Sequence, residues 1–205
     1  MFETEDLFSQ EDGKKKLKEK LEIVLTSFRK CTKGKPCNIP LLAYFKRFSK
    51  KGFKSKIKVG EYKIHQFYKE SGAGRLHGTI YSPIYVDAAY NFALVKGKKS
   101  ICGIAFRAGG TSAYARIFVR QIQGVPGKQK DLRPFRWEKM LLQILIDWAK
   151  QNGFERIDIV RAKNTGWWTR HKSERNERLY MKYDVTAKRM GFKLSGNRRV
   201  YSLHL

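Results

Sequence analysis

The chain has 205 residues, of which 41% are hydrophobic, enough for one domain with a core of its own. Lysine and arginine number 44 against 18 acidic residues, so the formal net charge is +26. This charge exceeds what solubility requires and predicts a polyanionic partner, nucleic acid first, with an anionic membrane surface or an acidic protein as alternatives. There is no apolar run of about 18 residues and no signal-peptide pattern, so we expect a soluble protein of the cytoplasm rather than a membrane-spanning one.

Cysteine and histidine give no metal pattern. The three cysteines, Cys31, Cys37 and Cys102, form no CxxC pair, which is typical of a reducing compartment. The four histidines belong to no HExxH motif. We therefore expect no bound metal.

The N-terminal quarter has two compositions. Residues 1–13 hold five acidic residues and no basic one, and predict a flexible acidic leader. Residues 14–56 predict a basic segment of two helices, separated by the turn-rich residues 33–38, with Asn38 as the N-cap of the second. The apolar residues at helical spacing are Leu17, Leu21, Val24, Leu25 and Phe28 in the first helix and Leu41, Leu42, Phe45 and Phe48 in the second.

Lysines cluster in this segment and predict phosphate contacts. The alternative is a solvated helix face. The lysines expected to contact nucleic acid are Lys14, Lys15, Lys16, Lys18, Lys20, Lys50 and Lys51.

From residue 57 the hydrophobic pattern changes from helical to strand-like, and residues 57–205 predict one α+β domain. Strands are expected within 57–68, 79–86, 90–95, 100–106 and 113–122, with consecutive antiparallel hairpins among the last three. The glycine-rich residues 71–78 predict a loop. We expect helices to cover the faces of the sheet.

The remaining residues predict helix, strand, helix, strand. Residues 136–154 form a long amphipathic helix, with Pro134 in its first turn and Gly153 at its C-cap. A buried strand follows at 157–160, then a second helix at 179–192 and a closing strand at 199–205. The apolar face of the long helix comprises Leu141, Leu142, Leu145, Ile146 and Ala149.

This order resembles the C-terminal half of the GNAT-type acyltransferases, over residues 57–205. The resemblance is carried by a helix ending in Ala149-x-x-x-Gly153-Phe154, a strand ending near Ala162 to Asn164, and a helix ending at Gly191-Phe192. It implies a GNAT-like mixed sheet and an N-acyltransferase whose donor is acetyl-CoA or another acyl-CoA. A non-catalytic module that binds nucleic acid or a ribonucleoprotein is the alternative.

In that family the strand before the long helix splays from its neighbour and offers backbone groups to the pantetheine of coenzyme A. A Q/R-x-x-G-x-G/A loop then holds the pyrophosphate at the helix N-terminus. The matching residues run from Gln121 to Pro126, where Pro126 replaces the last small residue and removes a donor. The resemblance implies that the cofactor-binding residues are Gln121, Gln123, Gly124, Gly127, Lys128, Arg133 and Arg136.

The family's frequent general acid is a tyrosine at the position of Ala187. Tyr183 lies one turn earlier on the same helical face and is the catalytic candidate, with a core role as the alternative. The segment 123–134, the following helix and the Tyr183-Asp184 pair also resemble the VirK/YbjX-type family of bacterial proteins.

The segment 164–178 combines aromatic and basic residues, a composition suited to stacking on bases while cations hold the backbone. Alternatively, one or both tryptophans pack on the core. The residues expected to contact nucleic acid here are Trp167, Trp168, Arg170, Lys172 and Arg175.

A third hypothesis is a metal-dependent nuclease. Glu155, Asp158 and Lys163 faintly resemble the acid-x-Lys strand of restriction-type nucleases, in which carboxylates hold Mg²⁺. The alternative for Asp158 is a strand-end residue paired with a nearby arginine.

Overall fold

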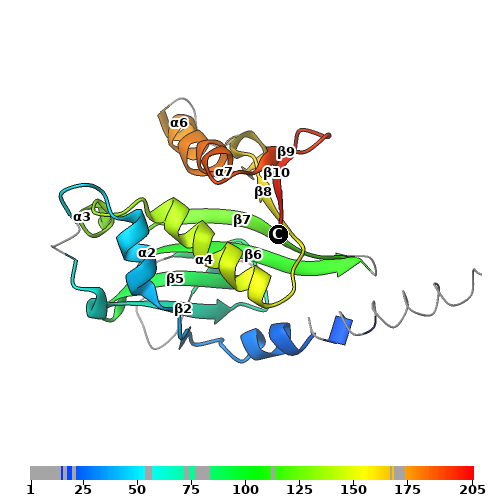
Figure 1. Ribbon diagram of the computed structural model, residues 1–205, viewed down its shortest axis with the longest axis horizontal. Helices are drawn as coiled ribbons and strands as arrows, with labels where there is room; N and C mark the ends of the chain where they lie inside the picture. Colours follow the sequence, from blue (N-terminus) through cyan, green and yellow to red (C-terminus); the bar gives the residue numbers. More distant parts are fainter. Residues whose placement is uncertain are drawn as a thin grey trace, which may run out of the picture.

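The computed structural model describes residues 15, 18, 19, 22–53, 57–71, 74–76, 84–111, 114–166, 168 and 174–205 (Figure 1). At its centre is an eight-stranded sheet in the order β1-β2-β5-β6-β7-β8-β10-β9. The strands are β1 (Lys35–Pro36), β2 (Tyr62–Tyr68), β5 (Tyr90–Lys96), β6 (Lys99–Thr111), β7 (Tyr114–Gly124), β8 (Arg156–Val160), β9 (Lys193–Leu194) and β10 (Val200–His204). A separate two-stranded sheet pairs β3 (Gly74–Arg75) with β4 (Tyr85–Val86).

Helical segments connect these strands. They are α2 (Leu41–Phe48), the 3₁₀ turn η2 (Val59–Glu61), α3 (Gln129–Leu132), α4 (Trp137–Gln151), the 3₁₀ turn η3 (Ala162–Asn164), α6 (Glu174–Tyr180), the π-helical turn η4 (Met181–Val185) and α7 (Thr186–Arg189). Residues 22–29 are also helical.

The sheet is mixed, which confirms the predicted α+β class. β5, β6 and β7 form the two expected antiparallel hairpins. β7 and β8 run parallel, and α4 is the crossover between them. β10 then pairs antiparallel with both β8 and β9. This is the element order that the resemblance to GNAT-type acyltransferases implies for the second half of the chain.

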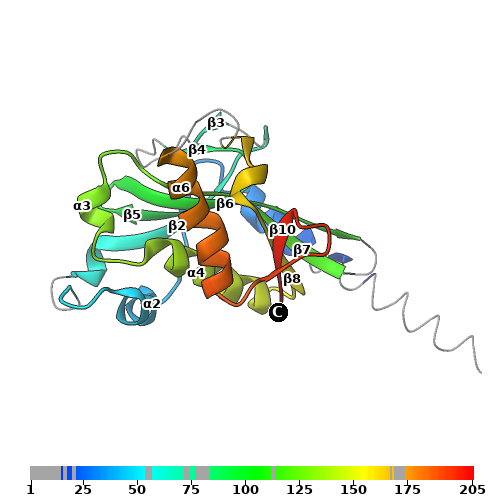
Figure 2. The same ribbon diagram turned by 90° about the horizontal axis from the view of Figure 1, so that it is seen from above.

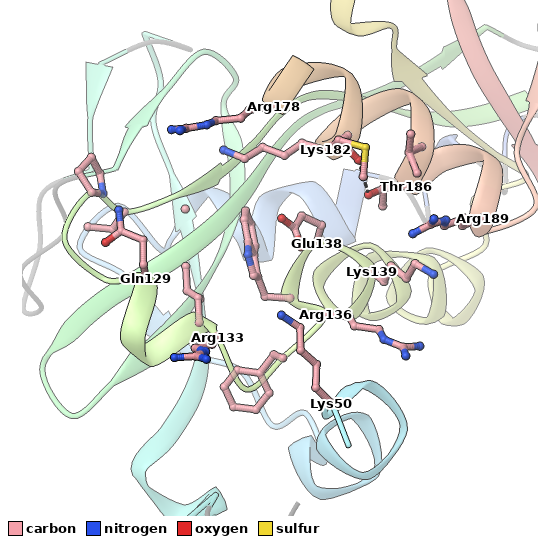
Figure 3. A pocket seen from close by; sticks show the side chains of 18 residues that line it. Lys50, Gln129, Arg133, Arg136, Glu138, Lys139, Arg178, Lys182, Thr186 and Arg189 are labelled. Carbon is pink, nitrogen blue, oxygen red and sulfur yellow. Dashed lines mark hydrogen bonds between the residues drawn. The ribbon is translucent and has the colours of Figure 1, made fainter. Parts of the chain in front are cut away.

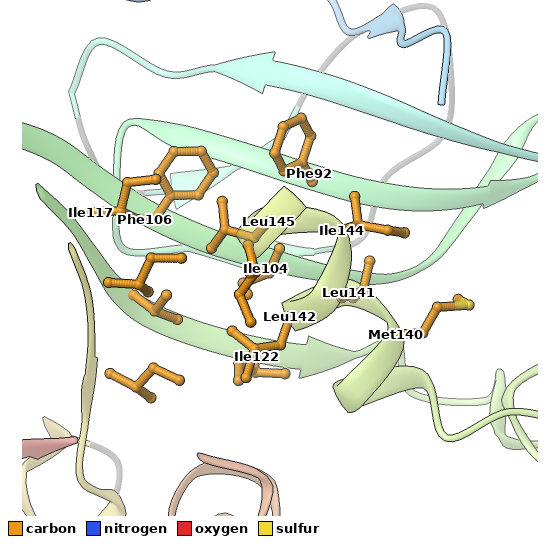
Figure 4. Close-up of a cluster of buried hydrophobic side chains, with 14 of the residues drawn as sticks. Phe92, Ile104, Phe106, Ile117, Ile122, Met140, Leu141, Leu142, Ile144 and Leu145 are labelled. Carbon is orange, nitrogen blue, oxygen red and sulfur yellow. The ribbon is translucent and has the colours of Figure 1, made fainter. Parts of the chain in front are cut away.

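Alternation along the central strands divides the core in two. Phe92, Ile104 and Phe106 face α4 and pack with the apolar face of that helix (Figure 4). The intervening Ala93 and Ala105 face the opposite side, where Leu76, Ile84 and Val86 cover them. The β3–β4 region covers this second face, on the side of the sheet opposite α2 and α4 (Figure 2), so the expectation that helices cover the faces of the sheet is wrong here.

The N-terminal segment packs on the same core. Leu25, Phe28 and Phe45 belong to the hydrophobic cluster that includes the sheet and α4. Phe45 stacks on Phe135 with ring centroids 4.7 Å apart. Among the described residues, the segment 14–56 thus has no core of its own, and the acidic residues 1–13 lie outside the described part.

Two predicted helix starts are corrected. The N-cap of α2 is Pro40 instead of Asn38, because the chain from 35 to 36 first adds β1 to the edge of β2. α4 begins at Trp137, so Pro134 precedes its first turn. Gly153 follows α4 with φ of 74°, which confirms the expected glycine terminator.

β7 separates from β8 halfway along its length. The β7–β8 pairing covers only residues 116–119 of β7. At this point the β6–β7 register shifts, with Ala105 opposite Gln121 and Phe106 opposite Val119, so Arg120 is a bulge residue. The second half of β7 therefore leaves its neighbour and leads to the N-terminus of α4.

Candidate functional site: a basic cleft at the amino end of α4

A cleft of about 1120 Å³ lies between the N-terminus of α4 and the helical run from α6 to α7 (Figure 3). The end of β7 and the residue Lys50, just after α2, complete its walls. Among the described residues that line it, the basic ones are Lys50, Arg133, Arg136, Lys139, Arg178, Lys182 and Arg189, and the acidic one is Glu138. The cleft is thus strongly electropositive.

Backbone hydrogen bonds fix the wall on the α2 side. The Arg136 N–H donates to the Phe48 carbonyl at 2.9 Å, and the Lys50 N–H donates to the Pro134 carbonyl at 2.8 Å. These bonds join the end of α2 to the segment that enters α4. They place Lys50, Arg133 and Arg136 around one opening, although the first is far from the others in sequence.

Helical spacing builds the opposite wall. Arg178, Lys182 and Arg189 follow one another at intervals of four and seven residues, which brings them to one side of a helix. Between them lies η4, where the Thr186 hydroxyl donates to the Met181 carbonyl at 3.2 Å. π-Helical turns are rare in proteins, and those that occur are often found at functional sites.

The cations of the cleft have one acidic neighbour among the described residues and form no ion pair. None of the seven lies within ion-pair distance of a described carboxylate, whereas Lys96 and Arg161 elsewhere each pair with an aspartate. The N-cap residue of α4, Arg136, makes no side-chain capping hydrogen bond, although the Glu138 carboxylate accepts one from the N–H of its own residue. The first N–H groups of a helix have no partner within it and attract anions. Side chains and backbone therefore both favour an anionic ligand.

Burial perturbs the two half-buried ionisable groups that face each other here. It raises the pKa of Glu138, although Lys182 and Lys50 act in the opposite direction. It lowers the pKa of Lys182, which Arg178 lowers further and Glu138 raises. The Lys182 ammonium lies 5.8 Å from the centre of the Trp137 ring. A bound anion would stabilise the charged form of Lys182.

The structure brings three of the predicted cofactor residues to this cleft. Gly124, Arg133 and Arg136 line it, together with Pro126. Gly127, in a turn with φ of 77°, and Lys128, 3.8 Å from the carboxylate of Asp131, are not among its lining residues.

Gln121 and Gln123 do not line this cleft, and their expected role in binding a cofactor stays a prediction. They flank Ile122 on β7, and because Ile122 faces the α4 side, both glutamines face the β3–β4 side. Gln121 is 5% exposed, and its amide donates to the Gln123 carbonyl at 3.1 Å.

Tyr183 contacts the second half of β7, where β7 no longer pairs with β8; we call this separation the strand split. It is 2% exposed; its hydroxyl accepts a hydrogen bond from the Ile122 N–H at 3.1 Å and donates to the Arg120 carbonyl at 3.4 Å. Burial raises its pKa well above the usual value. These are the backbone groups that, by resemblance, would face a pantetheine. The role of general acid stays a prediction.

The sequence prediction missed the cleft residues of the first turn of α4 and of the helical run from α6 to α7. Glu138, Lys139, Arg178, Lys182 and Arg189 were not singled out as cofactor residues. For the last three, the signal was the four- and seven-residue spacing of basic residues. It was obscured because the second helix was predicted to begin at residue 179, whereas α6 already begins at Glu174.

The predicted nucleic-acid residues are dispersed. Lys50 lines the cleft; Lys15, Lys18 and Lys51 are exposed. Trp168 is half-buried and packs against the core, as the alternative interpretation expects. Arg175 lies in α6. The residues that fall outside the described part are Lys14, Lys16, Lys20, Trp167, Arg170 and Lys172.

The carboxylate of Asp158 is held by hydrogen bonds within the fold. Its carboxylate accepts hydrogen bonds from Arg156 at 2.7 Å and Ser202 at 2.6 Å. Among the described residues, no group of three or more His, Cys, Asp or Glu is placed to hold a metal ion. The nuclease hypothesis therefore gains no support. Within the same residues, no helix is both long and apolar enough to cross a membrane.

Comparison with known proteins gives only distant structural likenesses. No protein-family model matches the chain, and no curated protein matches it in sequence. Two solved structures are similar at 14% identity over 56% of this chain. They are Arabidopsis thaliana Naa50 in complex with the bisubstrate analogue CoA-Ac-MVNAL (71% of that chain, TM-score 0.36) and an N-acetyltransferase from Staphylococcus aureus Mu50 (64% of that chain, TM-score 0.32). Neither likeness carries an inference about ligand or activity, and the resemblance to the VirK/YbjX-type family is matched by none of these findings.

Proposed function

We propose that the cleft binds the phosphates of coenzyme A and that the protein is an acyl-CoA-dependent acyltransferase associated with nucleic acid. One observation carries the proposal: seven basic side chains that form no ion pair with a described residue surround the N-terminus of α4, where the N-cap residue makes no capping hydrogen bond. Coenzyme A carries a diphosphate and a further phosphate, with about four negative charges near neutral pH. The cleft volume of about 1120 Å³ also suits a ligand of this size.

Each wall would have its own part in binding. Arg133, Arg136 and Lys139 surround the N–H groups of the first turn of α4, where a diphosphate gains both charge and oriented donors. Arg178 and Arg189 approach from the opposite wall, and arginine holds phosphate oxygens in a bidentate manner. The acyl group would be supplied as a thioester by the bound donor.

A second candidate function is a binding module that holds phosphates without transferring an acyl group. It is favoured by Tyr183, whose hydroxyl already occupies the N–H of Ile122 and the carbonyl of Arg120 in the strand split. A donor that used these groups would first have to displace the hydroxyl from a buried position. The two functions therefore differ in whether the cleft recognises more than phosphate.

Isothermal titration of nucleic-acid-free protein with coenzyme A, acetyl-CoA and ATP separates them. Micromolar binding of both coenzyme A species, at least tenfold tighter than ATP, supports the acyltransferase. Equal binding of ATP supports the module. The variant Arg136→Ala plus Arg189→Ala should lose most of the affinity. Lys98→Ala plus Lys99→Ala, at exposed positions beside the β5–β6 turn, is the control of equal charge change. An unaffected Arg136/Arg189 variant would remove the cleft from the binding site.

A further inference from the structure

The cations of the cleft continue onto the neighbouring surface. Arg47 at the end of α2 and Lys51 after it are exposed and form no ion pair with a described residue. Arg47 instead lies over the Phe48 ring, 5.3 Å from its centre. With the seven cations of the cleft they form what we call the basic band, which runs from α2 across the N-terminus of α4 to α7. Its members are Arg47, Lys50, Lys51, Arg133, Arg136, Lys139, Arg178, Lys182 and Arg189.

The charge of the basic band exceeds the need of one small ligand. Nine cations and the carboxylate of Glu138 leave eight positive charges. Coenzyme A would neutralise about four of them. The remainder points to an anion that extends beyond the cleft, and a polymer of phosphates supplies one charge per repeat.

The shape of the basic band decides which polyanion fits. Its central cations lie in the walls of a cleft, with Lys139 and Lys182 half-buried, rather than on a flat face. A planar bilayer would meet only the rim. A nucleic-acid duplex is stiff over distances much longer than this protein, whereas a single strand bends into a hollow and follows a charged groove. Five of the nine cations are arginines, which suit phosphodiester oxygens.

We propose that a single strand of nucleic acid binds along the basic band, with its phosphates passing through the cleft and over the end of α2. The inference rests in part on the proposed phosphate binding in the cleft. However, Arg47 and Lys51 are not among the residues that line the cleft. The two proposals can therefore fail separately.

Fluorescence anisotropy with a labelled single-stranded oligonucleotide of about 20 nucleotides, as DNA and as RNA, tests the proposal. Two charge-reversal variants probe the two parts of the basic band: Arg47→Glu plus Lys51→Glu outside the cleft, and Arg136→Glu plus Arg189→Glu inside it. The control is Lys98→Glu plus Lys99→Glu, which changes the net charge equally at exposed positions that do not line the cleft. Thermal melting of each variant confirms that it folds.

We expect both band variants to bind the oligonucleotide at least tenfold more weakly and the control less than threefold more weakly. The slope of log affinity against log salt should become shallower by about 1.4 for the band variants, since each lost phosphate contact on a single strand contributes about 0.7. Only the cleft variant should also lose coenzyme A binding. An outer variant that behaves like the control would overturn the inference, as would tighter binding of duplex or of phosphatidylserine vesicles than of the single strand. Absence of coenzyme A binding by the unchanged protein, with oligonucleotide binding retained, would defeat the acyl-donor proposal and leave this one standing.

Discussion

The molecule treats charge in opposite ways at two neighbouring places. Beneath β8 and β10 the carboxylate of Asp184 is 1% exposed and fully engaged. It accepts hydrogen bonds from the Ala162 N–H at 2.8 Å, from Arg161 at 3.2 Å and from the Tyr201 hydroxyl at 3.2 Å. In the cleft, by contrast, Lys139 and Lys182 are half-buried and form no ion pair with a described residue.

This difference distinguishes a charge that stabilises the fold from charges that are available to a ligand. A charge that serves the fold is matched inside it, because an unmatched buried charge costs stability. Under our proposal, a bound anion supplies the counterions of the charges that form no ion pair in the cleft. Asp184, with its full set of hydrogen bonds, lies within two helical turns of Lys182. The unpaired cations of the cleft are therefore not a general property of this basic chain.

The largest expected effect comes from breaking the matched site. Asp184→Ala should destabilise the protein by about 3–5 kcal/mol, because it leaves Arg161 without its partner and the Ala162 N–H without an acceptor. Urea unfolding measures the change. Glu155→Ala, at an exposed carboxylate, should change stability by no more than about 0.5 kcal/mol. Similar losses of unfolding free energy in both variants would show that the hydrogen bonds of Asp184 do not stabilise the fold.

The hydroxyl of Tyr183 should have an intermediate effect. Tyr183→Phe keeps the ring but leaves the Ile122 N–H without its acceptor, and a buried unsatisfied donor costs about 1–3 kcal/mol. Tyr85→Phe, at an exposed ring, is the matched control. Chemical denaturation should therefore resolve the two variants. Equal midpoints would mean that the strand split does not depend on this hydrogen bond.

Removing an unmatched charge should act in the opposite direction. Burial lowers the pKa of Lys182, so at neutral pH its charged form costs the folded state free energy. Lys182→Met should raise stability by about 0.5–1 kcal/mol and weaken phosphate binding at the same time. Lys163→Met, at an exposed lysine, should do neither. A loss of stability in Lys182→Met would show that the side chain has a structural partner.

The sequence was sufficient for the fold where periodicity is unambiguous. Leu141, Leu142 and Leu145 define the buried face of α4, and the apolar run after it becomes β8 as predicted. The cleft was harder, because its walls meet through backbone bonds between α2 and the segment before α4, which no local pattern encodes.

The prediction for Gln121 and Gln123 shows a second limit. Motif spacing placed them at the donor loop, but within a strand the two-residue period decides which face a side chain takes. Because Ile122 faces α4, its two neighbours turn to the other side. The predicted strand 113–122 contains the alternation as far as Ile122, and extending it by one residue predicts that Gln121 and Gln123 share a face.

The smallest expected effect concerns Glu138, the acidic side chain among the described residues that line the cleft. Burial raises the pKa of Glu138, and a bound phosphate repels its ionised carboxylate. Affinity for a phosphodiester oligonucleotide should therefore rise as pH falls through this raised pKa, because protonation removes the repulsion. Lys182 and Lys50 face the same carboxylate and lower its pKa, against the effect of burial. Glu138→Gln should bind the oligonucleotide a few-fold more tightly at neutral pH and lose this part of the pH dependence.

Glu61→Gln, at an exposed acid outside the cleft, is the control and should keep the pH dependence. Anisotropy titrations between about pH 5 and pH 8 suit this test, since phosphodiesters stay ionised throughout. An unchanged profile in Glu138→Gln would mean that the anion binds away from the first turn of α4.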